Sequence, residues 1–164
     1  MSDILSKIDD PTYSFHDIIT DPQIVKLYKT NDSVYSYFKS HYFKLLDYSL
    51  GTHNATYGLN SYEILICGDT DILEPILKSE IFLSRAIEII NNEKSDSFLI
   101  GRLSHIMQTS FLFLPELSIN TFSFIFQLLQ FTSNSSVLDL FSTILSNQEN
   151  FSIVHNWLIK VGFI

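Results

Sequence analysis

Residues 131–145 read Phe-Thr-Ser-Asn-Ser-Ser-Val-Leu-Asp-Leu-Phe-Ser-Thr-Ile-Leu, a polar start followed by an amphipathic run. Ser136 and Asp139 stand in the S-x-x-D relation of a capping box, in which the two side chains hold the first turn of a helix. The apolar residues that follow recur at helical spacing: Val137, Leu138, Phe141, Ile144 and Leu145. We therefore predict a helix that begins near Ser136, and we expect the rest of the chain to repeat this unit.

The same pattern of a short polar cap and an apolar run recurs along the chain, and almost no segment alternates with the strand period of two. We therefore predict an all-α fold. The expected helices are residues 3–8, 13–19, 22–31 after the Asp21-Pro22 start, 32–50, 60–67, 71–78 with Pro75 inside, 80–91 after Ser79, 96–113 after Ser95, 121–131 after Asn120, 137–147, and a last one from Asn150 or Ser152 to Gly162.

Short connections between consecutive helices favour antiparallel neighbours. We expect antiparallel helix pairs stacked as a right-handed superhelix of armadillo (ARM) or HEAT type. Residues 1–164 would form a single helical-repeat domain, the N-terminal part of a longer solenoid. No strict repeat is visible, so a compact helical bundle is the alternative architecture.

Composition narrows the classes of partner and compartment. The formal net charge is −8, which argues against binding to nucleic acid or to an anionic membrane surface. Cys67 is the only cysteine and the first residues lack an apolar run of signal-peptide length, so we expect a cytoplasmic protein, with the nucleus as a second compartment. The longest apolar stretches, residues 98–114 and 122–131, are interrupted by charge or too short, so no transmembrane helix is expected.

Charge is spread unevenly along the sequence. From residue 97 to residue 164 the only charged residues are Arg102, Glu116, Asp139, Glu149 and Lys160. A segment this poor in charge is expected to bury part of its surface against something else. Self-association through the apolar C-terminal end near Phe163 is one way to do so.

The order of several short segments resembles the SAPS-domain family, the regulatory subunits of type 6 (Sit-four-like) serine/threonine protein phosphatases. The segments that carry the resemblance are residues 21–48 with Val34, Phe38 and Leu45, residues 61–67 around Glu63, residues 71–83, Ser104-His105, residues 135–140 with Asp139, and Trp157-Leu158 with residues 162–164. The chain departs from the family where Ser61-Tyr62 replaces a Tyr-Pro pair, where residues 91–97 lack proline, and where residues 130–132 replace a His-Ile-Gly segment.

The resemblance implies a non-catalytic regulatory or scaffold protein that binds the catalytic subunit of a serine/threonine phosphatase. The residues that it points to for partner binding are Arg102, Ser104, His105, Asn134, Ser135, Asp139 and Trp157. Four of these residues have a structural alternative. Arg102 and His105 can be the solvated stripe of their helix, Trp157 a core anchor, and Asp139 the capping-box carboxylate. A generic helical adaptor with no phosphatase link is the alternative function.

Residues that could support catalysis or metal binding are scarce. Cys67 could join a histidine and an aspartate as a thiol nucleophile, but no signature surrounds it and a buried structural thiol is the simpler interpretation. The residues Asp69-Thr70-Asp71 begin like a calcium loop but lack its later glycine and glutamate, and a helix N-terminus explains both carboxylates better. We therefore expect no enzymatic activity, no metal and no cofactor.

Overall fold

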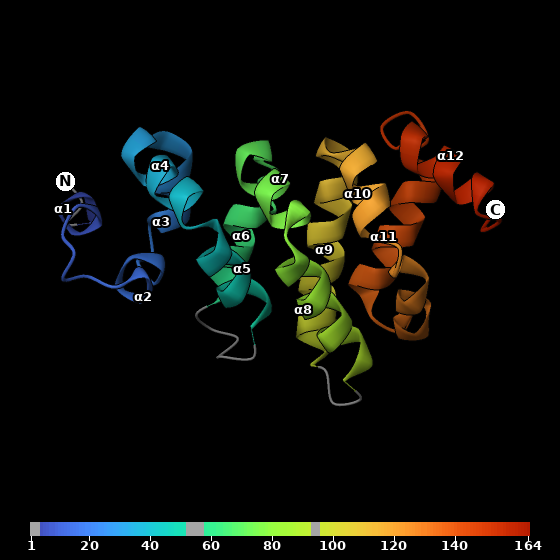
Figure 1. The fold of residues 1–164 in the computed structure, drawn as a ribbon, viewed down its shortest axis with the longest axis horizontal. Coiled ribbons are helices and arrows are strands. Elements are labelled where there is room, and N and C mark those ends of the chain that lie inside the picture. Colours follow the sequence, from blue (N-terminus) through green and yellow to red (C-terminus); the bar gives the residue numbers. More distant parts are fainter. Residues whose placement is uncertain (1–3, 52–57, 93–95) are drawn as a thin grey trace. The chain divides into compact units, whose positions relative to one another are not determined.

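The computed structural model describes residues 4–51, 58–92 and 96–164, and these residues form helices with no strand among them (Figure 1). The all-α prediction is thus confirmed. The chain divides into two compact units, Met1–Ile72 and Leu73–Ile164. Stacking of helix pairs as a superhelix, and a single repeat domain, stay predictions.

The first unit is built around two helices, α4 and α6. The helices of this unit are α1 (Ile4–Ile8), α2 (Phe15–Ile19), α3 (Ile24–Thr30), α4 (Asp32–Ser40), α5 (Tyr42–Leu50) and α6 (Gly58–Leu65). Helix α4 packs against α1, α3 and α5, and helix α6 packs against α3 and α5. Val34, Phe38, Leu45 and Leu46 are fully buried between them. Gly68 follows α6 in the left-handed region, at a φ of 81°, where a side chain would be strained.

The prediction of one continuous helix over residues 32–50 is wrong, because the helix breaks at His41. The His41 backbone has φ −115° and ψ 26°, and its N–H donates to the carbonyls of both Tyr37 and Phe38. The Ser40 hydroxyl also donates to the Tyr37 carbonyl, at 2.8 Å, and the His41 Nδ1 lies 2.7 Å from the same oxygen. Local side-chain bonds of this kind compete with the helical ladder. The apolar residues keep their helical spacing across His41, so the periodicity of the sequence does not reveal the break.

The second unit is organised around helix α9. Helix α7 (Thr70–Lys78) leads into the unit, and its other helices are α8 (Glu80–Asn91), α9 (Ser97–Phe113), α10 (Pro115–Thr121), the 3-10 helix η1 (Ile125–Phe131), α11 (Ser135–Ser146) and α12 (Ser152–Lys160). Helix α9 packs against α8, α10 and α11, while α12 packs against α10 and α11. Leu103, Ile106, Met107 and Phe111 of α9 are fully buried.

Two expected helix boundaries in this unit are wrong. Pro115 ends α9 as predicted, but it also starts α10, because proline fits the first position of a helix, whose N–H needs no partner. The α-helix expected over residues 121–131 is therefore replaced by the end of α10 and by η1. Ser79 caps α8 as predicted, accepting from the Phe82 N–H. The predicted cap at Ser95 lies outside the described residues, and the Asp96 side chain accepts from the Phe98 N–H.

Candidate functional site

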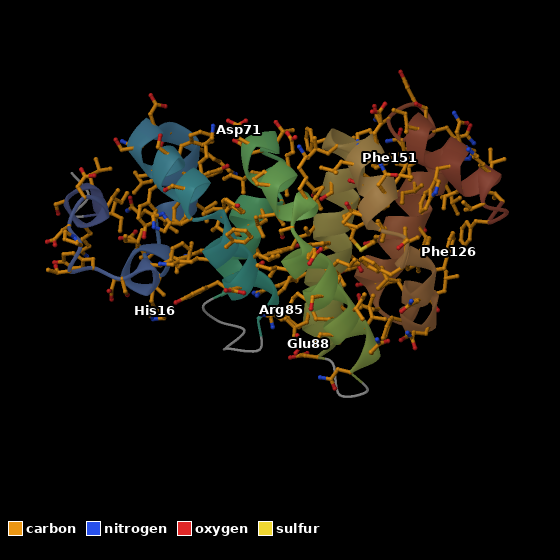
Figure 2. All side chains as sticks on the ribbon, viewed as in Figure 1. His16, Asp71, Arg85, Glu88, Phe126 and Phe151 are labelled. Atoms are coloured by element: carbon orange, nitrogen blue, oxygen red, sulfur yellow. The ribbon has the colours of Figure 1, made fainter. Side chains whose placement is uncertain are left out.

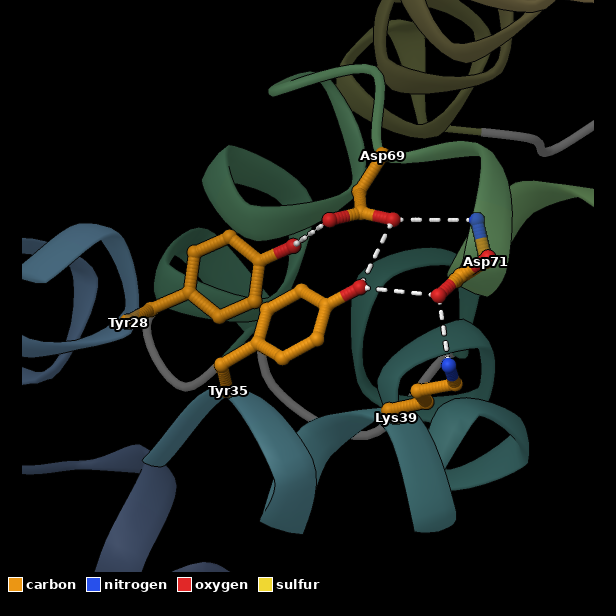
Figure 3. A network of polar contacts seen from close by, with 5 residues as sticks. All are labelled: Tyr28, Tyr35, Lys39, Asp69 and Asp71. Atoms are coloured by element: carbon orange, nitrogen blue, oxygen red, sulfur yellow. Dashed lines mark hydrogen bonds and ion pairs between the residues drawn. The ribbon is translucent and has the colours of Figure 1, made fainter. Parts of the chain in front are cut away.

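Five side chains of the first unit meet in a hydrogen-bonded group at the start of α7, which we call the polar clasp (Figure 3). Its members are Tyr28 of α3, Tyr35 and Lys39 of α4, and Asp69 and Asp71. The Tyr35 hydroxyl lies 3.2 Å from Asp69 Oδ1 and 3.2 Å from Asp71 Oδ2, and the Tyr28 hydroxyl lies 3.4 Å from Asp69 Oδ2. Lys39 forms an ion pair of 2.5 Å with Asp71. The clasp thus joins α3 and α4 to the first turn of α7.

The two carboxylates of the clasp are placed by the helix that follows them. Asp69 Oδ1 accepts the Asp71 N–H at 2.9 Å, so Asp69 caps α7. Free N–H groups and the helix dipole favour negative charge at this end. The interpretation of Asp69-Thr70-Asp71 as a helix N-terminus is confirmed, because Asp69 caps α7 and Asp71 lies in its first turn.

The proton equilibria of the clasp favour neutral phenols beside charged carboxylates. Desolvation, together with the hydrogen bond and the negative charge of Asp69, raises the pKa of Tyr35 to about 12. Desolvation and Asp69 also raise the pKa of Tyr28. The hydrogen bond and positive charge of Lys39 lower the pKa of Asp71. Each hydroxyl of the polar clasp thus has a carboxylate to donate to, and the Lys39 charge has Asp71 as its partner. This arrangement favours a structural role for the clasp.

Asn134 connects the starts of two helices in the second unit. Its Oδ1 accepts the Ser136 N–H at 3.0 Å, and its Nδ2 donates to the Ser97 carbonyl at 2.7 Å. The helices approach closely here, since a Cβ on Gly101 would lie 3.2 Å from Ser136 Oγ. Asn134 therefore caps α11 and ties it to α9.

The predicted capping box of Ser136 and Asp139 is wrong. The observed cap of α11 is Asn134, two residues before the predicted one. Ser136 therefore lies inside the helix, and its N–H donates to Asn134 Oδ1. The Asp139 side chain is exposed and makes no hydrogen bond with another described residue. Ser135 is also exposed, at the first position of the helix. Asp139 is thus accessible to a partner, whereas its expected structural role is absent.

The candidate residues of α9 are less accessible than the sequence suggested. Arg102 is only 3% exposed, and its guanidinium carbon lies 3.9 Å from the centre of the Phe98 ring. Its assignment to a solvated stripe is therefore wrong. Ser104 is fully buried and donates to the Ile100 carbonyl at 2.9 Å. His105 is partly exposed. A partner could reach Arg102 or Ser104 only if α9 rearranged.

Trp157 of α12 lies in an aromatic cluster. Its ring centre lies 6.3 Å from that of Phe111 and 6.1 Å from that of Phe126, which lies on η1 (Figure 2). Phe163 extends the cluster through Phe126, at 5.3 Å. Trp157 stays partly exposed, so it combines a packing role with an accessible edge.

Exposed apolar side chains are concentrated in the charge-poor part of the second unit, residues 97–164. We call the nine large ones the apolar surface set: Phe98, Leu112, Phe113, Leu129, Leu138, Ile153, Ile159, Val161 and Ile164. Only four charged residues in this range are exposed: Glu116, Asp139, Glu149 and Lys160. The first unit, over its described residues, exposes three large apolar side chains: Tyr13, Phe43 and Leu59. Apolar residues that occur singly are normal on a protein surface, but residues 97–164 expose more than twice as many large apolar side chains as charged ones.

Cys67 and the acidic residues do not form a recognisable reaction centre. The Cys67 thiol is exposed, so the expectation of a buried thiol is wrong, and its sulfur donates to the Glu63 carbonyl at 3.2 Å. Desolvation raises the pKa of this thiol, which is the opposite of what an activated nucleophile needs. Within the ranges that the structure describes, no three histidine, cysteine or acidic side chains are grouped to hold a metal ion.

The polar clasp could not be predicted from the sequence, although Asp69 and Asp71 were expected at a helix N-terminus. Asn134 and Ser135 were expected as contacts only because of the resemblance to a known family. None of the helices in the described part of the chain has the length and apolarity needed to cross a membrane.

Comparisons with protein-family models, with curated proteins and with solved structures found no match for this chain.

Proposed function

We propose that this chain is a non-catalytic helical interaction protein whose second unit docks on a partner protein through the apolar surface set. The observation that carries the proposal is the excess of exposed large apolar side chains over exposed charges between residues 97 and 164. Protein interfaces are depleted of charge and enriched in aromatic and large apolar side chains at their centre. Burying such side chains against a partner removes apolar area from water, which favours association.

The resemblance to SAPS-domain proteins supports a more specific form of this proposal. In that form the partner is the catalytic subunit of a type 6 serine/threonine phosphatase, and the helices stack as antiparallel pairs of ARM or HEAT type. The accessible candidate contacts are His105, Asn134, Ser135, Asp139 and the edge of Trp157.

One observation favours the generic helical adaptor, with no phosphatase link, as the second candidate. Arg102 and Ser104, which the resemblance implies as contacts, are buried within α9. A partner that requires these two side chains could not reach them at this surface. The generic adaptor needs only the apolar surface set.

The test is a titration of the purified chain with a purified type 6 phosphatase catalytic subunit by calorimetry. The double variant Leu138→Glu and Ile159→Glu places two charges in the apolar surface set and is expected to weaken binding at least about tenfold. The matched control is Ser84→Glu, at an exposed position of α8 outside residues 97–164, which is expected to leave affinity unchanged. No binding by the parent chain would refute the phosphatase link, and equal binding by the double variant would refute the apolar surface set as the site.

Self-association is tested in the same samples by light scattering. If the second unit buries its apolar surface against another copy, the parent chain will be larger than a monomer and the double variant will be monomeric. A parent chain that is already monomeric at high concentration contradicts self-association but leaves the docking proposal intact.

A further inference from the structure

We propose that helix α7 is a hinge between the two units, which bends in the turn of residues 71–75 and whose first turn is held by the polar clasp. Helix α7 covers Thr70–Lys78, and the boundary between the units falls inside it, between Ile72 and Leu73. One helix is thus shared by both units. This inference does not depend on the docking surface proposed for the second unit.

Pro75 weakens α7 at the unit boundary. Proline has no backbone N–H, so it cannot donate to the carbonyl four residues earlier, and its ring crowds that carbonyl. Pro75 lies inside α7, and the carbonyl in question belongs to Asp71. The turn that lacks its hydrogen bond is therefore residues 71–75, and it contains the boundary after Ile72. Helices bend at such turns because one backbone hydrogen bond is missing.

The part of α7 before this turn is held by the first unit. Its cap, Asp69, accepts from the hydroxyls of Tyr28 and Tyr35. Asp71 forms an ion pair with Lys39. These contacts make up the polar clasp (Figure 3), and all of its members precede the unit boundary. The first turn of α7 therefore moves with the first unit as long as the clasp is intact.

The part of α7 after the turn is held by the second unit. Leu73 and Leu77 are buried. The Thr121 hydroxyl of α10 donates to the Leu77 carbonyl at 3.3 Å. Ser79, directly after α7, caps α8. The turn that lacks its hydrogen bond thus lies between two parts of the chain that are each held in place, which is the arrangement of a hinge.

The exposed ion pair makes the clasp sensitive to salt. The side chains of Lys39 and Asp71 are 49% and 53% exposed, so dissolved ions screen their attraction. Loss of this ion pair leaves the first turn of α7 with fewer contacts to the first unit. The hinge can then bend over a wider range, so the clasp regulates its motion.

The test measures the distance distribution between two spin labels in the full-length chain by pulsed electron paramagnetic resonance. The labels are attached at Ser36→Cys in α4 and Ser142→Cys in α11, two exposed positions, in a Cys67→Ser background. Pro75→Ala restores the backbone N–H and is expected to narrow the distribution about twofold. Glu74→Ala changes the neighbouring exposed residue but keeps the proline, so this matched control should have the width of the parent.

The clasp is tested in the same labelled chain. Tyr35→Phe with Lys39→Gln removes one hydroxyl and the ion pair and should broaden the distribution, as should high salt in the parent. Lys26→Gln, at an exposed lysine of α3 outside the clasp, should leave the width unchanged. The hinge is overturned if Pro75→Ala is as broad as the parent, or if Glu74→Ala narrows the distribution equally. The role of the clasp is overturned if its double variant is as narrow as the parent.

Discussion

The Tyr35 hydroxyl lies between two carboxylates but has only one proton to donate. It is 3.2 Å from both Asp69 and Asp71, so at any instant it donates to one of them, and the other carboxylate is then held by its other partners alone. Asp69 also accepts from Tyr28 and from the Asp71 N–H, and Asp71 also pairs with Lys39. Tyr35 is therefore the residue that couples the two halves of the polar clasp.

Replacing this hydroxyl should destabilise the first unit. We expect Tyr35→Phe to lower the free energy of unfolding by about 1–2 kcal/mol, because a hydrogen bond to a charged acceptor is lost while the ring is kept. Urea unfolding measures the change. Tyr28→Phe, which removes the longer bond of 3.4 Å, should cost less. A Tyr35→Phe variant as stable as the parent would show that the clasp contributes nothing to folding.

The raised pKa of Tyr35 predicts a loss of stability at alkaline pH. Its ordinary pKa of 10.0 is raised to about 12 in the fold, so the folded state keeps a proton that the unfolded state loses. The stabilisation is complete below pH 10 and disappears as the pH rises toward 12. Unfolding measured across this range should show a smaller alkaline loss in Tyr35→Phe than in the parent. Equal slopes would contradict a raised pKa.

At the scale of single helices, the caps decide where each element begins. Asn134→Ala removes the cap of α11 and its bond to Ser97, and we expect a loss of about 1–2 kcal/mol in the free energy of unfolding. Asp139→Asn, on the exposed face of the same helix, should change stability by less than about 0.5 kcal/mol. Thermal or urea unfolding of both variants makes the comparison. The reverse order would restore the capping box that the sequence suggested.

The all-α class and most helix positions could be predicted because they depend on periodic apolar residues and nearby caps. The start of α11 was misjudged because Asn134, Ser135 and Ser136 are all good caps, and only the contact of Asn134 with Ser97, 37 residues away, distinguishes them. The break at His41 could not be predicted because it depends on local hydrogen bonds that leave the apolar spacing unchanged. The polar clasp could not be predicted because its bonds between helices join residues at least 32 positions apart.

At the scale of the whole molecule, the chain provides a separate optical probe for each unit. All eight tyrosines lie before residue 63, in the first unit, while the only tryptophan is Trp157, in the second. Each unit has its own buried core. Differences between the tyrosine and tryptophan signals during unfolding therefore report on the two units separately.

This separation gives a prediction about cooperativity. In Tyr35→Phe, the urea midpoint followed by tyrosine signals should fall more than the midpoint followed by Trp157 fluorescence, because the lost bond belongs to the first unit. Ser84→Glu, an exposed change outside the clasp, is the control for general effects of substitution. Equal shifts of both midpoints would show that the two units unfold as one.

The exposed thiol of Cys67 makes the polar clasp accessible to chemical labelling. As the only cysteine, two residues before Asp69, it offers a single attachment point for a spin label or a fluorophore without any prior substitution. Its raised pKa keeps the thiolate scarce at neutral pH, so the reaction will be slow there and will accelerate in mildly alkaline buffer. A label at this position would report the local motion of the α7 start directly, with and without the Tyr35 hydroxyl.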